Sequence, residues 1–129
     1  MSTHETPMEI DGTAEAPVEQ RISILPVEGD QPGDESACTF VLKKEGHTMS
    51  GLLRYILHRF PEVTFSGYSI PHPSVDETHL RIETDGSITP ADAFRRALDT
   101  VMDMSDHMML QFQHEIQHGK YTFTPEYEA

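Results

Sequence analysis

Residues 89–118 read TPADAFRRALDTVMDMSDHMMLQFQHEIQH, and this stretch decides the fold. Thr89 is a good helix N-cap, Pro90 suits the first helical position, and Asp92 places an acid in the first turn, so we expect a helix to begin here. The helical pattern continues to the end of the stretch, where Gly119 follows as a natural C-cap. A helix of about 30 residues is about 45 Å long, which is long for a small domain.

One face of this expected helix carries residues at alternating spacings of four and three, which is typical of a helix-packing seam. The seam comprises Phe94, Leu98, Val101, Ser105, Met108 and Phe112, with Met102, Met109 and Ile116 beside it. The combined apolar face is wider than one small sheet requires. Either the whole face covers the chain's own core, or one part packs on the sheet and another part on a partner. Methionine suits both interpretations, because its flexible side chain fills irregular contacts.

A second amphipathic helix is predicted upstream. Its apolar stripe follows helical spacing and comprises Met49, Leu52, Leu53, Ile56, Leu57 and Phe60. Thr48 is the expected N-cap, and Pro61 marks the expected stop. As in the long helix, these side chains could all belong to the core, or some could reach a partner.

Four further segments have the residue pattern of β-strands, namely residues 21–27, 36–44, 63–70 and 79–84. In the second segment Cys38, Phe40 and Leu42 share one face, and in the fourth Leu80 and Ile82 are expected to point inward. The order strand, strand, helix, strand, strand, helix predicts the α+β class. We expect a mostly antiparallel four-stranded sheet packed with two helices, of which the C-terminal one is long.

The third strand segment changes its alternation along its length. Val63 and Phe65 have one parity and Tyr68 and Ile70 have the other, and a β-bulge at Gly67 would explain the change. Two prolines then force an extended exit from the strand. We interpret this segment as a structural motif and not as a ligand site; it comprises Gly67, Tyr68, Ile70, Pro71, His72 and Pro73.

Composition narrows the class of protein. The 129 residues predict one domain, expected over residues 20–129 after a disordered acidic tail of residues 1–19. The net charge of -13 repels a phosphate backbone, so no direct sequence-specific contact with nucleic acid is expected. Cys38 is the only cysteine, which excludes an internal disulfide and a thiolate-rich zinc site and fits a reducing compartment. No apolar run approaches the roughly 20 residues that span a bilayer, so no membrane contact is expected.

The end of the long helix contains a zinc-peptidase pattern. His114-Glu115-Ile116-Gln117-His118 matches H-E-x-x-H, in which the histidines bind zinc and the glutamate activates water. The match is weak, because Tyr121 and Thr124 stand where the longer metzincin pattern needs Gly and His. A zinc peptidase is therefore a remote alternative, and metal binding by the two histidines alone is a closer one. The simplest interpretation is a solvated helix end, and we predict no catalytic residue, no metal ligand and no cofactor.

Two motifs give the chain a family resemblance. The run Gly67-Tyr-Ser-Ile-Pro-His-Pro-Ser74, followed by Leu80-Arg-Ile-Glu-Thr84, resembles the G-Y-x-I-P-H-P-S and L-R-I-Q-T segments of the small alpha-like subunits shared by RNA polymerases I and III. The run His47-Thr-Met-Ser-Gly-Leu-Leu-Arg54 resembles the D-H-T-L-G-N-x-L-R motif at the start of that family's first helix. The chain departs from these patterns at Gly46, Ser50, Gly51 and Glu83, where the family has Asp, Gly, Asn and Gln.

The resemblance implies a non-catalytic assembly subunit of the nucleus, including the nucleolus. Members of the family form a heterodimer with a larger alpha-like subunit, and the pair scaffolds the large catalytic subunits that make rRNA, 5S rRNA and tRNA. The catalytic magnesium lies in those other chains. The alternative is a standalone homodimeric α+β binding module that uses the same helix faces in an isologous contact.

The partner interface is expected on the two helices. It comprises His47, Thr48, Met49, Leu52, Leu53, Arg54, Ile56, Phe94, Leu98, Val101, Met102, Met108, Met109 and Phe112. Periodicity does not separate the members of this set that face the partner from those that face the chain's own core.

Overall fold

A computed structural model describes residues 17–31, 33–119 and 121–122 of the chain. Of the expected tail, residues 1–16 lie outside the described part, as do residues 123–129 at the other end. The elements are β1 (Ile22–Leu25), β2 (Ala37–Lys43), α1 (His47–Leu57), β3 (Val63–Ser69), β4 (Glu77–Thr84) and α2 (Pro90–Gln117). The predicted fold class, element order and long C-terminal helix are confirmed.

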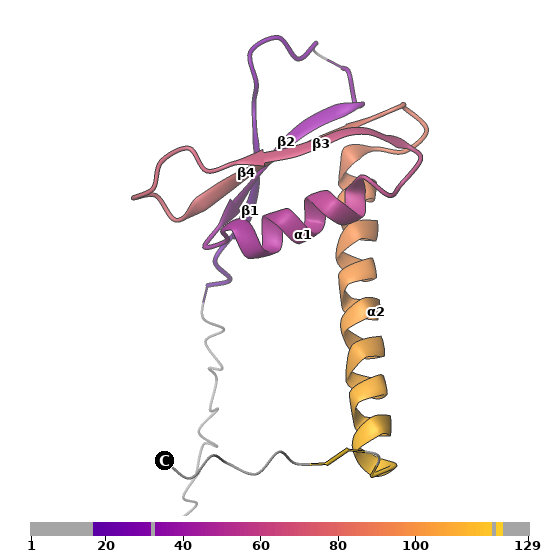
Figure 1. The fold of residues 1–129 in the computed structure, drawn as a ribbon. Helices are drawn as coiled ribbons and strands as arrows, with labels where there is room; N and C mark the ends of the chain where they lie inside the picture. The colour runs from indigo at the N-terminus through magenta and orange to yellow at the C-terminus, as the bar shows by residue number, and fades with distance from the viewer. Residues whose placement is uncertain (1–16, 32, 120, 123–129) are drawn as a thin grey trace, which may run out of the picture.

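The four strands form one antiparallel sheet in the order β1-β2-β4-β3. Both helices pack on the same face of this sheet, where α1 lies along it and α2 begins beside it (Figure 1). From there α2 runs away from the sheet, so that its second half projects from the domain (Figure 1). The fold therefore consists of a two-layer domain and a protruding helix.

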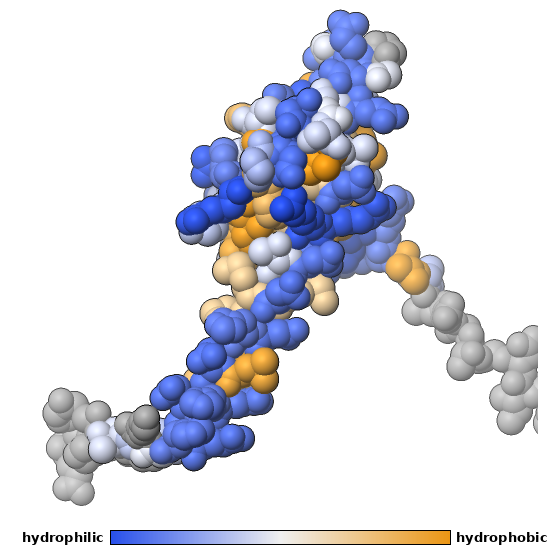
Figure 2. All heavy atoms as spheres, turned by 90° about the vertical axis from the view of Figure 1, so that its right-hand side faces the viewer, coloured by the Kyte–Doolittle hydropathy of each residue, from blue (hydrophilic) through white to orange (hydrophobic). Residues whose placement is uncertain are grey.

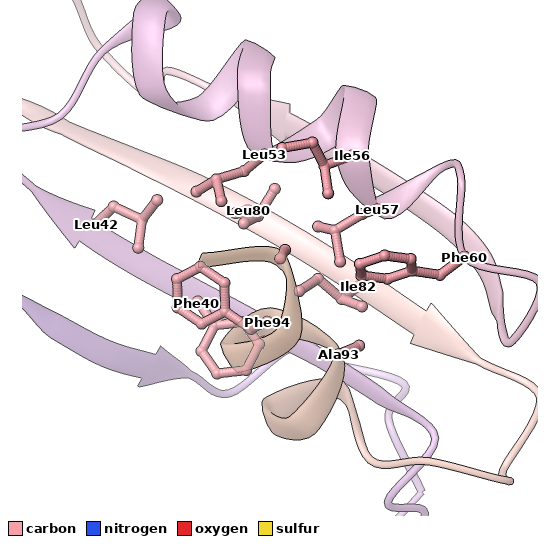
Figure 3. Packing of buried hydrophobic residues seen from close by; sticks show 11 residues of the cluster. Phe40, Leu42, Leu53, Ile56, Leu57, Phe60, Leu80, Ile82, Ala93 and Phe94 are labelled. Atoms are coloured by element: carbon pink, nitrogen blue, oxygen red, sulfur yellow. The ribbon is translucent and has the colours of Figure 1, made fainter. Parts of the chain in front are cut away.

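The core lies between the sheet and the first turns of α2, with α1 closing it (Figure 3). Phe40 and Leu42 of β2 and Leu80 and Ile82 of β4 point to the helices, as their alternation predicts. The ring of Phe40 packs on the ring of Phe94 from α2, with 5.0 Å between the centroids. From α1 and the turn after it the core receives Leu53, Ile56, Leu57 and Phe60, and from α2 it receives Ala93, Phe94 and Ala97.

The sequence predicts the N-cap of α2 correctly but not the N-cap of α1. The cap of α2 is confirmed, because the Thr89 hydroxyl accepts a hydrogen bond from the backbone N–H of Asp92. Gly119 follows the helix with a φ of 59°, the left-handed conformation that glycine adopts at low cost. The predicted cap of α1 is wrong, because Gly46 and not Thr48 is the N-cap, and among the described residues no side chain makes a cap hydrogen bond to this helix.

The change of parity in β3 arises at a different place from the one predicted. The irregularity lies between Val63 and Phe65, whereas Gly67 pairs regularly with Arg81. After this step Ser66 and Tyr68 face the helices, and Phe65 faces the opposite side of the sheet. A Cβ at Gly67 would lie 3.0 Å from the Phe65 ring, so the glycine gives room to that ring.

Ser50 in α1 provides a test of this packing. Its hydroxyl oxygen is completely buried and has no hydrogen-bond partner among the described residues. An unpaired buried hydroxyl costs about 1–3 kcal/mol, so Ser50→Ala is expected to raise the free energy of unfolding by about 1 kcal/mol. Urea unfolding should show a higher midpoint at an unchanged slope.

Ser66→Ala is the matched control, because this equally buried hydroxyl donates to the carbonyl oxygen of Arg54 at 3.3 Å. It should not gain stability. If both alanine variants lose stability to the same degree, Ser50 has a partner and the packing of α1 described above is wrong.

Candidate partner-binding surface

No other described part of the chain covers the second half of α2. Every residue from Met102 to Gly119 is exposed, whereas Ala93, Phe94 and Ala97 in the first turns are buried. The exposed apolar side chains on the seam side of this half comprise Met102, Met108, Met109, Phe112 and Ile116, which we call the bare stripe. Phe112 and Met108 are each 63% exposed, which is unusual for side chains of this size.

The bare stripe continues the core face of the helix. The seam that begins at Phe94 reaches Met108 and Phe112 with unchanged spacing. The same side of α2 is therefore covered by the sheet at its start and is exposed farther along, as far as residues 17–31, 33–119 and 121–122 show. In Figure 2 the visible face of the projecting half is mostly hydrophilic, with one isolated apolar spot, as an amphipathic helix requires. Among the described residues no helix is both long and apolar enough to cross a membrane.

At the base of the stripe lies an apolar hollow of about 240 Å³. Its apolar lining comprises Ile22, Leu42, Met49, Leu53, Phe94 and Leu98, and Arg21, Lys43 and Glu45 also line it. The edge strand β1 adds Ile24, which is 67% exposed and lies two residues along the strand from Ile22, on the same face. The hollow, the edge strand and the bare stripe together make one candidate binding surface.

The structure divides the predicted interface set into three groups. Leu53, Ile56 and Phe94 are at most 5% exposed and belong to the chain's own core, although Leu53 and Phe94 also line the hollow, so their place in the interface stays a prediction. Met49, Leu98 and Val101 are half-buried at the border of the core. The remaining members are exposed: His47, Thr48, Leu52, Arg54, Met102, Met108, Met109 and Phe112.

Two residues of the candidate surface are absent from the predicted interface set. Ile22 and Ile24 alternate in the first strand segment, which reads as an ordinary inward face. Because β1 is the outer strand, no helix covers that face, and both side chains remain exposed. The short length of the strand and its place next to a proline were the available signals.

The segment from Gly67 to Pro73 makes structural contacts. The hydroxyl of Tyr68 is hydrogen-bonded to Nδ1 of His47 at 2.9 Å, which ties β3 to the start of α1. His72 is exposed, and its Nδ1 accepts from the backbone N–H of Ser74 at 3.1 Å within a tight turn. These contacts support the predicted structural role, which stays a proposal.

Two pKa shifts concern groups with possible reactivity. Burial, and next the negative charge of Asp30, raise the pKa of the Cys38 thiol, so that it stays protonated and a poor nucleophile at neutral pH. Hydrogen bonds to Asp30 and then to Glu83 raise the pKa of the Arg81 guanidinium above its usual range. Arg81 thereby fixes the loop that carries Asp30 to β4.

The zinc-peptidase pattern lies on the exposed last turns of α2. His114 and His118 stand one turn apart, and the described residues contain no group of three side chains that could hold a metal ion together. The hollows found among the described residues are lined by other parts of the chain and do not include this helix end. The zinc-peptidase alternative is therefore unsupported.

Comparison with known proteins gives one consistent result. Residues 37–111 match the family described as the RNA polymerase Rpb3/Rpb11 dimerisation domain. The chain is 39% identical over 97 residues to the Schizosaccharomyces pombe DNA-directed RNA polymerases I and III subunit RPAC2, covering 75% of each chain. It is 39% identical over 90 residues to the Drosophila melanogaster protein of the same name, covering 68% of this chain and 83% of that one.

A third RPAC2, from Saccharomyces cerevisiae, is 38% identical over 84 residues, which are 65% of this chain and 59% of that protein. Among solved structures, the DNA-directed RNA polymerase subunit L of Thermoplasma acidophilum superposes with a TM-score of 0.63 at 19% identity. The match covers 79% of this chain and 96% of that chain. At this identity the similarity concerns the fold alone.

Proposed function

Because the chain belongs to the RNA polymerase Rpb3/Rpb11 dimerisation domain family, we propose that it is the small alpha-like assembly subunit of nuclear RNA polymerases I and III. In this role it pairs with a larger alpha-like subunit and has a structural function, with no active site of its own. The relatives named RPAC2 support the assignment to polymerases I and III.

One observation supports the proposed pairing with a larger subunit: the core face of α2 continues into the bare stripe. Burial of apolar surface stabilises a complex by about 25 cal/mol per Å², and a specific interface covers about 800 Å² on each partner. A bare helix half, an apolar hollow and an exposed edge strand in continuity provide a surface of the required kind. Left uncovered, such a surface promotes aggregation.

The charge of the chain supports a role away from the nucleic acid. Lys and Arg number 9 against 22 Asp and Glu, which gives the net charge of -13. Proteins that bind DNA directly present positive surfaces to its phosphates. We therefore propose that the pair formed with the larger subunit scaffolds the large catalytic subunits, which contact the template and synthesise rRNA, 5S rRNA and tRNA.

Expression of the chain alone and with its partner tests the pairing. Alone, the chain is expected to be poorly soluble or to self-associate; with the larger alpha-like subunit of the same organism it should form a soluble one-to-one complex. Size-exclusion chromatography with light scattering distinguishes these states. A well-behaved isolated monomer would contradict the proposal, and a stable homodimer that ignores the larger subunit would establish the standalone binding module instead.

A tagged copy tests the assignment to the two polymerases and to the nucleus with its nucleolus. Affinity purification from nuclear extract should recover large subunits of both polymerase I and polymerase III, and fluorescence should include the nucleolus. Recovery of polymerase II subunits alone would show that the assignment within the family is wrong.

A further inference from the structure

Two histidines stand side by side on the last turns of α2. The ring centroids of His114 and His118 are 3.9 Å apart, and the ring planes are inclined by 30°. Both side chains are exposed. Residues four apart on a helix occupy neighbouring positions on one face, so the backbone itself holds the two imidazoles together.

The hydrogen bond at the His118 ring leaves its Nε2 open to bind a metal ion. Nδ1 of His118 lies 2.8 Å from the carbonyl oxygen of His114. A carbonyl only accepts, so Nδ1 of His118 carries the proton and Nε2 keeps a lone pair. Nδ1 of His114 lies 3.7 Å from a carboxylate oxygen of Glu115, which is too far for a hydrogen bond, so this contact does not fix which nitrogen of the His114 ring carries the proton. When one ring nitrogen of a histidine donates a hydrogen bond to an oxygen, the bond fixes the tautomer in which the other nitrogen can bind a metal ion.

The pair stays accessible when the bare stripe is covered. Counted around the helix from Ser105 in the middle of the seam, His114 lies about 180° away and His118 about 140° away. A partner that covers Met108 and Phe112 therefore leaves these imidazoles in solvent. The strongly negative chain also raises the local concentration of cations.

We propose that His114 and His118 form a two-ligand binding site for a divalent transition-metal ion of the kind that imidazole prefers, such as Zn²⁺ or Cu²⁺. The ion binds Nε2 of both rings at about 2.0–2.1 Å, after a small rotation of the rings, and water completes its coordination. The described residues bring no third ligand to this place, so the site binds and does not catalyse. By linking two successive turns, the ion holds the end of α2 in helical form.

Isothermal titration of the purified full chain, alone or in complex with its partner, with ZnCl₂ and separately with CuCl₂ tests the site. The parent should bind one ion per chain that is lost, or weakened at least about tenfold, in His114→Ala and in His118→Ala. His107→Ala, on the same helix but outside the pair, is the matched control and should bind like the parent. Zinc should also slow amide hydrogen exchange in the last turns of α2 in the parent and not in the two variants.

Absence of saturable binding by the parent would overturn the proposal. So would equal binding by the parent and both variants, because the ion would then be held elsewhere. Neither outcome depends on pairing with a polymerase subunit. The titration therefore tests the metal site independently of the proposed function.

Discussion

Replacing Met108 and Phe112 together with aspartate is expected to weaken pairing with the larger alpha-like subunit by at least about a hundredfold while the domain stays folded. Both side chains project from the bare half of α2 and touch no core residue in the described structure, so their removal leaves the two-layer domain intact. Two carboxylates placed in an apolar contact lose their hydration without gaining a partner, and each costs several kcal/mol there.

Leu110→Asp is the matched control for this experiment. Leu110 is as exposed as Met102, at 64%, but lies about 140° around the helix from Ser105. It should pair like the parent, as measured by titration or by co-purification. The double variant alone should also be more soluble than the parent, since it removes exposed apolar surface. Normal pairing of the double variant would show that the bare stripe is not the interface.

Leu53→Asp is expected to unfold the chain. Leu53 is 1% exposed in the middle of the core, between α1 and the sheet (Figure 3). Loss of a buried leucine costs about 2–5 kcal/mol, and a buried unpaired carboxylate adds several more. The sum approaches or exceeds the about 5–15 kcal/mol by which domains are stable. Circular dichroism of the variant should lack the helical signal of the parent, and co-expression with the partner should not restore a soluble complex.

Leu52→Asp provides the comparison within the same helix. Leu52 is 37% exposed, so its aspartate keeps contact with water and the fold should survive. A folded Leu53→Asp variant, or an unfolded Leu52→Asp variant, would show that the face of α1 is assigned wrongly.

Much of this architecture follows from periodicity in the sequence. The seam of α2, the cap at Thr89 and the inward faces of β2 and β4 depend on local spacing, which a single element determines by itself. The same reasoning identifies the side of α2 that is apolar from Phe94 to Phe112.

The division of that side into core and interface does not follow from the sequence. It depends on where the sheet ends beneath the helix, which is a property of the assembled layers. Phe94 and Phe112 occupy equivalent positions in the seam, yet the first is buried and the second exposed. The step in β3 is similar: parity shows that a change occurs between Val63 and Ile70, but its place before Phe65 depends on how the strands pair in the sheet.

The bare half of α2 also affects how long an unpaired copy survives. Among the described residues no other element covers its backbone hydrogen bonds, so the turns beyond Met102 are expected to open at a small cost in free energy. An opened helix is a substrate for proteases, whereas a paired one is not. Copies made in excess of the partner are therefore expected to be degraded first, which would match the amount of this chain to that of its partner without any dedicated regulator.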